Sequence, residues 1–531
     1  MADTYDIIIC GSGSGGGYLA GEIAANASVL ILEAGPYVAG APNYGVGSPD
    51  RRKFSTQINL GTFIPDGMYS FGNGGASWQY PLQADKSNPT STGVTREGRI
   101  VGGGSTINVG AWIRPRAIDW DGFSAETGVK GWTKADFEPY LQQVEKVLSV
   151  RHDPPEYWNP GAVAYYKTAN GMGVPTFATA SNRHTGCIYC GHRNNAGMPC
   201  KYDALMSTAI TQIPKAMASG AVLVDNAMVQ QVNITNGKAT GVTYTKNGQT
   251  IVANANKLVV LAAGAIGTPL IMFSSGINLL NSNVGMHLRA HPGMSLEAFM
   301  PPGTDWNQDR GYQWNVYNYG MDGNGQPMDT LIYAASSFPN TSWLSCQVGN
   351  YGAPYKSMMK SFRDRLGAWI FLLKPNIEGR VLGRVDTPLV KFGIVDESGS
   401  IEPKAREDMA AALRQTAAIF RKMGATMLDP NPNVPMGQLI QTMSLKVPAA
   451  GLFHSQSTAR AGADPKNSVV DSNGMSFDVK NLMVADASII PHHISANTNA
   501  LVMAIGARAG DYVNKQILGV KAKAVADSEV A

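Results

Sequence analysis

The sequence predicts an α/β protein of two domains, α+β in its overall organisation. One domain is expected to be doubly wound around a parallel sheet, and the other to hold a mainly antiparallel β-sheet with helices. Three observations predict this. Residues 5–36 follow the pattern of strand, helix and strand. Segments within residues 293–400 alternate between apolar and polar residues, as antiparallel strands do. Residues 482–513 return to the order of strand, turn and helix.

The N-terminal unit carries a glycine motif. A short apolar run ends at Cys10, and Gly11, Gly13 and Gly16 then fit the spacing G-x-G-x-x-G. In such a unit the three glycines permit a tight turn, a close approach of the backbone to a pyrophosphate, and close packing of helix on strand. The helix N-terminus offers N–H groups to the phosphates. Glu33 ends the second strand and is expected to accept hydrogen bonds from ribose hydroxyls. The motif predicts a Rossmann-like site for an adenine dinucleotide.

The length, net charge and hydrophobic pattern of the chain limit the class of protein. A chain of 531 residues exceeds what one core fills comfortably, so two domains are expected. A net charge of +4 gives no reason to invoke nucleic acid as a partner. We find no apolar run of the roughly 18 to 20 residues that a transmembrane helix needs, and no signal-peptide pattern. The expected location is cytoplasmic, or periplasmic if the protein is exported with a signal-bearing partner.

Residues 98–277 have three further features. Residues 98–115 contain three consecutive glycines before Ser105 and Thr106, and such a loop can lie flat against a large planar ligand. Residues 220–270 show period-two alternation and an Asn-Gly hairpin signal, which indicates strands that return to the first sheet. Residues 264–277 are predicted to form a glycine turn leading into a helix.

The second half contains a long amphipathic helix, predicted over residues 402–424. Its apolar stripe is interpreted as core, with members Met409, Leu413, Ala417, Phe420 and Met423. The strand and helix near the C-terminus have the same order as the N-terminal unit, so the dinucleotide domain is expected to be discontinuous. We assign residues 1–150, 200–292 and 440–531 to it, and residues 151–199 and 293–439 to a substrate-binding domain.

With these motifs in order along the chain, the sequence resembles the glucose–methanol–choline (GMC) family of FAD-dependent oxidoreductases, which oxidise alcohols. The ADP-binding fingerprint of that family is similar to the first glycine motif with its acid. Residues 103–108 resemble the second flavin loop of the family, and residues 264–277 resemble its second signature. Residues 284–293 resemble its interdomain link, and the VADASIIP and SANTNA runs resemble its C-terminal catalytic block. Asn278 stands where a final glycine is usual in the second signature.

The resemblance implies roles for particular residues. His454 matches the active-site histidine, and Asn497 matches the second member of the pair, which is His or Asn in the family. Ile107 stands where members with covalent FAD have histidine, which implies non-covalent FAD. The cofactor-binding residues expected from these matches are Gly11, Gly13, Ser14, Gly16, Glu33, Gly103, Gly104, Ser105, Asn108, Gly110, Ala111, Val229, Asp486, Ala487, Asn497 and Thr498.

The chemistry agrees with those residue types. Oxidation by hydride transfer to flavin N5 requires a base for the hydroxyl proton, and a histidine with an ordinary pKa of about 6.5 can serve. His492 and His493 lie within five residues of Asn497 and compete with His454 for that role. His287 and His291 are interpreted as satisfying backbone groups near the interdomain link, and Asp486 as either a flavin contact or a helix cap.

A cysteine cluster remains open. Cys187, Cys190 and Cys200 fall within 14 residues and could hold an Fe–S cluster or zinc. The stretch resembles the cysteine insert of bacterial FAD sugar dehydrogenases and of long-chain alcohol oxidases, but it lacks the central cysteine of the dehydrogenases. That difference favours structural thiols or a local disulfide over a metal site.

The function expected from these observations is FAD-dependent oxidation of an alcohol, a sugar or glycoside hydroxyl being favoured because the middle region offers many Trp, Tyr and Asn residues. The electron acceptor is O2, a quinone or an acceptor protein, and an accessory subunit could be present. The alternatives are a hydroxynitrile lyase that binds FAD without redox turnover, since one fold hosts several reactions, and a non-catalytic flavin-binding subunit.

Overall fold

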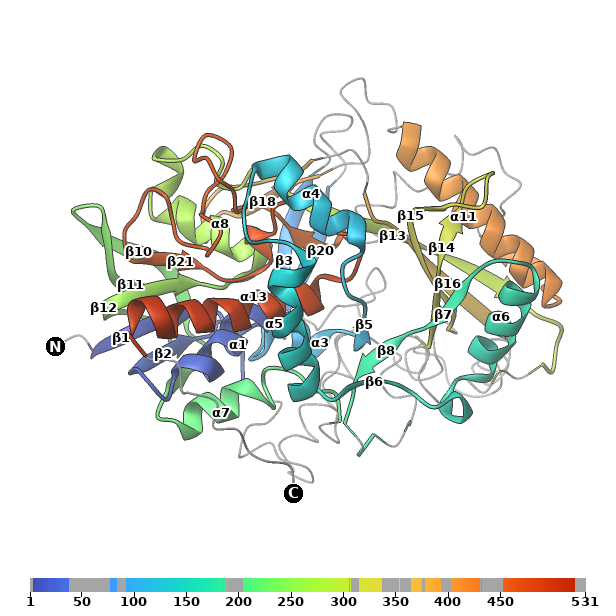
Figure 1. Ribbon diagram of the computed structural model, residues 1–531, viewed down its shortest axis with the longest axis horizontal. Helices are drawn as coiled ribbons and strands as arrows, with labels where there is room; N and C mark the ends of the chain where they lie inside the picture. Colours follow the sequence, from blue (N-terminus) through green and yellow to red (C-terminus); the bar gives the residue numbers. More distant parts are fainter. Residues whose placement is uncertain are drawn as a thin grey trace.

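The computed structural model describes most of the chain, and its elements keep the labels of Figure 1. The described residues are 3–37, 77–83, 92–184, 186, 187, 189, 204–304, 306, 315–336, 353, 364–374, 378–392, 403–429, 431 and 452–520.

A seven-stranded sheet forms the first lobe, with strand order β10-β11-β12-β1-β2-β9 and β21 beside β12. Neighbours are parallel from β21 to β9, whereas β10, β11 and the start of β12 are antiparallel. The strands are β1 (Asp3–Cys10), β2 (Val29–Leu32), β9 (Val222–Val224), β10 (Met228–Thr235), β11 (Lys238–Lys246), β12 (Gln249–Leu261) and β21 (Leu482–Val484).

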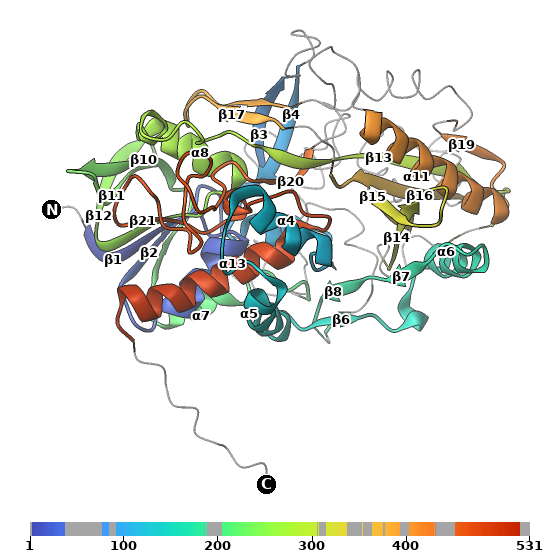
Figure 2. The ribbon, with the colours of Figure 1, turned by 45° about the horizontal axis from the view of Figure 1, so that its top comes forward.

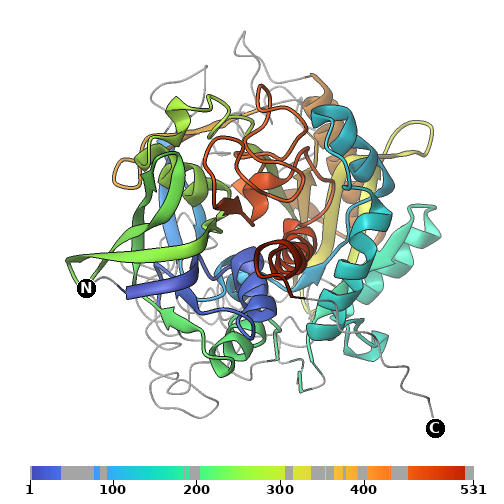
Figure 3. The ribbon, with the colours of Figure 1, turned by 60° about the vertical axis from the view of Figure 1, so that its left-hand side comes forward.

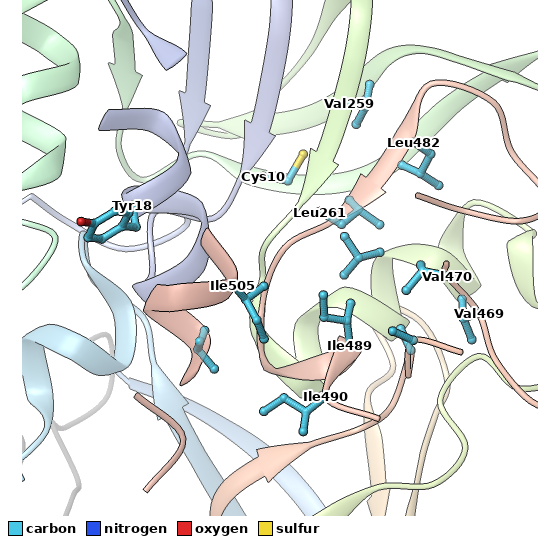
Figure 4. Close-up of a cluster of buried hydrophobic side chains, with 14 of the residues drawn as sticks. Cys10, Tyr18, Val259, Leu261, Val469, Val470, Leu482, Ile489, Ile490 and Ile505 are labelled. Atoms are coloured by element: carbon cyan, nitrogen blue, oxygen red, sulfur yellow. The ribbon is translucent and has the colours of Figure 1, made fainter. Parts of the chain in front are cut away.

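Helices cover this sheet, and its centre is apolar on both faces, as expected for a parallel sheet. Ile7, Ile8 and Ile9 are all 0% exposed. Figure 4 shows Cys10, Val259 and Leu261 of the central strands in one cluster with residues from the C-terminal segment. The helices of this lobe are α1 (Ser14–Ile23), α5 (Lys134–Val147), α7 (Gln212–Ala218), α8 (Gly264–Ser274) and α13 (Thr498–Tyr512), with the short turns η4 (Ile277–Leu279), η5 (Ala487–Ile489) and η6 (Val513–Ile517).

Helix α1, near the start of the chain, and helix α13, about 480 residues later, lie side by side in Figures 1 and 3. Glycines allow the contact: a Cβ on Gly506 of α13 would lie 2.4 Å from the Gly15 carbonyl oxygen of α1. The C-terminal segment therefore completes the N-terminal domain, both through α13 and through β21 in the sheet.

Gly506→Ala is expected to lower the free energy of unfolding by about 1–3 kcal/mol, because the added methyl group forces the helices apart. Gly171→Ala at the end of α6 is the matched control, since a Cβ there meets no atom within 4 Å, and it should be neutral or slightly stabilising. Thermal unfolding of both FAD-loaded variants measures the difference. Equal effects would contradict the close approach of the two helices.

The second lobe holds an antiparallel sheet in the order β19-β13-β16-β15-β14-β7, with β20 beside β13. Two helices cover one face, α6 (Pro160–Gly171) and α11 (Pro403–Lys422). The predicted apolar stripe of the long helix is confirmed as core for Met409, Leu413, Ala417 and Phe420, which are buried in one cluster with strand residues, and the partly buried Met423 packs against that cluster. The strands are β7 (Thr176–Ala178), β13 (Arg289–Phe299), β14 (Val316–Met321), β15 (Pro327–Ser336), β16 (Arg365–Leu372), β19 (Met427–Asp429) and β20 (Leu452–Gln456).

Two smaller sheets connect the lobes, in the orders β17-β18-β3-β4 and β5-β8-β6. Figure 2 shows β3, β4 and β17 together above the first lobe. The first of these sheets joins strands from segments 1–150 and 293–439, which the sequence assigned to different domains. Their elements, with the remaining helices, are β3 (Ser77–Gln83), β4 (Thr92–Gly98), β5 (Ala111–Trp112), β6 (Val150–His152), β8 (Ala180–Asn182), β17 (Arg380–Leu382), β18 (Leu389–Lys391), α3 (Gly103–Ile107), α4 (Ala117–Thr127) and η2 (Pro155–Tyr157).

Candidate active site

The two glycine-rich stretches lie against each other at the carboxyl end of β1. Gly11 has φ +108°, and a Cβ there would lie 2.2 Å from the Ala262 carbonyl oxygen, so the turn requires glycine. Gly103, at φ +50°, packs on Gly13, because its Cβ would lie 3.0 Å from the Gly13 Cα. The predicted flat loop contains a short helix, α3, that starts at this contact. Sheets of this kind bind ligands at the carboxyl ends of their strands, at the point where the strand order reverses, and here that point lies between β1 and β12.

Glu33 ties these loops together through Ser12, a residue that the glycine motif did not single out. The Glu33 Oε2 atom accepts hydrogen bonds from Ser12 N at 3.1 Å and Ser12 Oγ at 2.7 Å, and Oε1 accepts one from Gly35 N at 2.9 Å. Ser12 Oγ in turn accepts one from Gly102 N at 3.1 Å. Burial raises the pKa of the Glu33 carboxyl, and these hydrogen bonds oppose the shift. The carboxylate therefore fixes both loops, and the described residues fill three of its roughly four accepting positions.

Thr208 braces the same loops from the middle of the chain. Its N–H donates to Ser105 Oγ at 3.2 Å, and its hydroxyl donates to Ser12 O at 3.1 Å. Thr208 is completely buried. It lies outside every motif found in the sequence, so only the tertiary structure reveals its role.

Asp486 has the helix-capping role that was one of its two interpretations. It is the N-cap of η5, where Oδ1 accepts from Ser488 N at 2.8 Å and from Ser488 Oγ at 2.5 Å. Oδ2 accepts from Gly264 N at 2.9 Å and from Thr268 Oγ1 at 2.6 Å, at the start of α8. Burial raises the pKa of this carboxyl. A direct contact of Asp486 with flavin stays a prediction.

The first turn of α13 links the glycine loops to the predicted catalytic pair. Ser14, the first residue of α1, donates from Oγ to Asn499 Oδ1 at 2.7 Å. Asn497 is the N-cap of α13, but its side chain makes no capping hydrogen bond, so the amide is available elsewhere. Thr498 lies between them as the first helical residue and is partly exposed.

His454 and Asn497 lie in contact. Asn497 Nδ2 lies 3.2 Å from His454 Nε2, and the Tyr333 hydroxyl donates to Asn497 Oδ1 at 2.5 Å. The β13–β20 register is irregular between Arg289 and His291, opposite His454, which has φ +61°. Positive φ is costly for a non-glycine residue and is concentrated at functional sites. Irregular pairing of this kind re-aims a side chain, here the imidazole.

The other histidines are sorted by their contacts. His291 Nδ1 lies 2.8 Å from His454 Nδ1, and His291 also contacts a backbone carbonyl, as predicted. His493 stacks on His291 with ring centroids 5.1 Å apart. His492 lies 3.5 Å from Glu126 instead.

Several predicted cofactor residues lie around this edge. Gly16 lets α1 pack on β1, because a Cβ there would lie 2.2 Å from Gly11 O. Asn108 Oδ1 accepts from Gly110 N at 2.9 Å. Ala111 and Ala496 belong to the same buried cluster. Two further predicted cofactor residues are Val229, which is a core residue of β10, and Ala487, which is the first residue of η5; their contact with FAD stays a prediction. Ile107, from which non-covalent FAD was inferred, lies in α3 and is partly exposed.

Of the cysteine cluster, only Cys187 belongs to the described residues, where it is a free thiol 4.0 Å from Arg183 Nη1. Cys190 and Cys200 lie outside them. The choice between a metal site and structural thiols therefore stays open.

The residues at this edge fit FAD. Among the described residues, an added Cβ on Gly13 would meet no atom nearer than 4.0 Å and one on Gly104 none within 4 Å, so these residues leave space over both loops. Helix α1 begins without a side-chain cap and without an acidic residue in its first turn, which suits a pyrophosphate. Asn499 Nδ2 is buried and makes no hydrogen bond to the described residues. Gly13, Ser14 and Asn499 would hold the phosphates, and Glu33 the ribose.

The fold and this edge define a two-domain, dinucleotide-binding protein with a histidine–asparagine pair next to the nucleotide loops. The GMC oxidoreductase family profile matches residues 6–293 with its N-terminal part and residues 389–506 with its C-terminal part. The chain belongs to the GMC oxidoreductase family. The family resemblance predicted from the sequence is therefore confirmed, and so is the predicted fold class. The protein is an FAD-dependent oxidoreductase that acts on the CH–OH group of alcohols.

Individual relatives are distant. An oxygen-dependent choline dehydrogenase of Paraburkholderia xenovorans is 24% identical, over 96% of this chain and 94% of that protein. Pyridoxine 4-oxidase from Mesorbium loti superposes with a TM-score of 0.68 at 17% identity, over 97% of this chain and 99% of the other. An FAD-dependent oxidoreductase from Chaetomium thermophilum gives a TM-score of 0.67 at 19% identity, over 96% and 99%. In the part of the chain that the structure describes, no helix has the length and apolar composition needed to cross a bilayer.

Proposed function

We propose that the protein oxidises an uncharged alcohol, with His454 as the base for the hydroxyl proton and Asn497 as the group that holds the alcohol oxygen. The observation that carries this is the 3.2 Å contact between Asn497 Nδ2 and His454 Nε2. An alcohol oxygen beside both atoms would give its proton to Nε2 and accept a hydrogen bond from the amide. FAD, when bound, supplies the hydride acceptor.

Next to the pair lies an aromatic wall, which we define as Tyr317, Tyr319, Tyr333, Phe371 and Phe453. Its rings follow one another at centroid distances of 5.9 Å from Tyr319 to Tyr317, 6.4 Å from Tyr317 to Tyr333, and 6.1 Å from Tyr333 to Phe371. Phe371 and Phe453 lie 6.1 Å and 6.4 Å from the His454 ring. A substrate with a flat apolar face, an aryl alcohol or a sugar ring, would stack on such a wall.

The charges near the wall disfavour a cationic alcohol such as the choline in the relatives' name. The Arg116 guanidinium lies 4.8 Å from the Tyr319 ring centroid and already occupies that cation–π position. Two of the described carboxylates near the wall pair with basic side chains: Asp329 with Arg116 at 2.8 Å and Asp119 with Lys374 at 2.9 Å. The balance of charge favours an uncharged substrate.

The test is a panel of alcohols mixed anaerobically with the FAD-loaded protein, with the flavin absorbance recorded. Benzylic alcohols and hexoses or glycosides form separate arms, and choline is the third. Bleaching by one of the uncharged classes supports the proposal, and the faster arm identifies the substrate class. Bleaching by choline alone would overturn the substrate class. An unchanged spectrum with every alcohol, together with cleavage of a cyanohydrin, would favour the lyase. Air, a quinone and an artificial acceptor added to the reduced protein then separate oxidase from dehydrogenase.

The pH profile of flavin reduction should stay flat down to below pH 6.5 and fall only in more acidic solution. Burial, and secondarily the neighbouring His291, hold the pKa of His454 well below its usual 6.5. The base is active when neutral, and a lowered pKa keeps it neutral at more acidic pH. Stopped-flow reduction at saturating alcohol across the acid range measures the profile. A fall centred above pH 6.5 would contradict His454 as a desolvated base.

A further inference from the structure

A second histidine contacts the proposed base from the side away from Asn497. His291 lies in β13, opposite Phe453 of β20, and is 0% exposed. Its Nε2 atom lies 2.8 Å from the carbonyl oxygen of Ile494, and its Nδ1 atom lies 2.8 Å from Nδ1 of His454. Each ring nitrogen of His291 therefore has one defined partner.

The carbonyl decides where the protons lie. A carbonyl oxygen only accepts hydrogen bonds, so Nε2 of His291 must carry a hydrogen. A neutral imidazole has a single N–H, which leaves Nδ1 of His291 as an acceptor. His454 must then donate from its own Nδ1, and its single hydrogen is used there. Its Nε2 consequently bears the lone pair that faces Asn497.

We propose that His291 is a positioning residue for the reaction. Its Nε2–H donates to the Ile494 carbonyl, so its Nδ1 must accept from His454 Nδ1. This selects the His454 tautomer whose Nε2 can take the substrate proton. This inference rests on the proposed role of His454 as the base. His291 itself touches neither the substrate nor the cofactor in this scheme.

Two further observations agree with this direction. Burial lowers the pKa of His291 to about 4, which keeps it neutral and able to accept. The amide of Asn497 is oriented independently, because its Oδ1 accepts from the Tyr333 hydroxyl and its Nδ2 is left to donate toward His454. The opposite His454 tautomer would set an N–H against that amide and leave two lone pairs facing each other across the histidine pair, which is costly when buried.

The test compares two variants of similar size, His291→Asn and His291→Leu. The asparagine side chain reaches about as far as Nδ1 and keeps an acceptor for His454, whereas leucine has none. We expect the limiting rate of anaerobic flavin reduction to be at least about tenfold higher in the Asn variant, a part of the effect of a positioned base. Both should retain FAD. Equal rates in the two variants would overturn the proposal.

His493 provides the matched control. It is 1% exposed and stacks on the His291 ring, but it makes no hydrogen bond to the described residues. His493→Asn and His493→Leu should therefore reduce the flavin at similar rates. A difference between these two variants as large as that at His291 would mean that the rate depends on any polar group stacked near His454, and it would also overturn the proposal.

A spectroscopic measurement covers the case in which the leucine variant does not fold. In protein labelled with ¹⁵N-histidine, the ¹⁵N shifts identify which ring nitrogen carries hydrogen, and His454→Asn assigns the signals. The expected result for the unmodified protein is a hydrogen on Nδ1 of His454 and none on Nε2. A hydrogen on Nε2 of His454 and none on Nδ1 would overturn the proposed role of His291. If His454→Asn lost flavin reduction while His291→Asn and His291→Leu were reduced at equal rates, only the positioning role of His291 would be refuted. Retained reduction in His454→Asn would refute the proposed function.

Discussion

Replacing His454 by asparagine should leave FAD bound and slow its reduction by alcohol about a hundredfold to ten-thousandfold, the usual contribution of a positioned base. Asparagine is the informative choice because position 454 has φ +61°, a conformation that asparagine tolerates well. The change therefore removes the base without adding backbone strain. Its amide cannot accept the substrate proton, whereas the nucleotide loops near α1 are untouched.

The control for this prediction is His287→Asn. His287 has φ +60°, almost the same backbone conformation, but its ring pairs with the Glu378 carboxylate at 2.7 Å and not with a backbone group as its interpretation from the sequence had it. Its replacement should change the reduction rate by less than about threefold, the range of a change outside the site. Stopped-flow reduction under nitrogen and the ratio of flavin to protein absorbance measure both quantities. If His454→Asn were reduced as fast as the unmodified protein, His454 would not be the base.

The second large effect is expected at Gly13. Gly13→Val should fold yet bind FAD more than about a hundredfold more weakly, equivalent to about 2.7 kcal/mol. The reason is the space over this glycine, where a Cβ would meet no atom of the described residues nearer than 4.0 Å. We expect the protein to accommodate a branched side chain there, whereas that side chain would fill the space in which the pyrophosphate must approach the backbone.

Gly11→Val separates this effect from a loss of folding. At Gly11 the added Cβ would lie 2.2 Å from a backbone carbonyl, and φ is +108°, so this variant should be destabilised whether or not FAD is present. Circular dichroism, thermal unfolding and fluorescence titration with FAD measure the two cases. A Gly13→Val protein that binds FAD with unchanged affinity would place the cofactor elsewhere.

Local patterns predicted a large part of the fold. The apolar run ending at Cys10, the glycine spacing and the long helix each depend on neighbours in sequence. The helix expected over 402–424 is observed as Pro403–Lys422. The loop at 98–115 was expected to be flat, and the structure places α3 within it, because Gly102 and Gly103 both adopt positive φ and turn the chain into a helical start.

Contacts between distant segments were beyond such patterns. The sheet that joins β3 and β4 to β17 and β18 is one example, since parallel pairing of β3 with β18 leaves no periodic signal in either strand. Ser12 and Thr208 are another, because their role is to hydrogen-bond the loops from remote positions. His291 was interpreted only as a partner of the backbone, and its contact with His454 depends on the β13–β20 pairing.

By itself the sequence determined the class of this protein: a nucleotide-binding glycine turn, an antiparallel second domain and the residues of the predicted pair, because glycine spacing and hydrophobic period follow directly from backbone geometry. Only the tertiary structure decided how the pair is arranged. The positive φ of His454, the carbonyl of Ile494 opposite His291 and the hydroxyl of Tyr333 on Asn497 come from three separate segments. Hydrogen-bond direction depends on which donor meets which acceptor in space, and no local pattern records that.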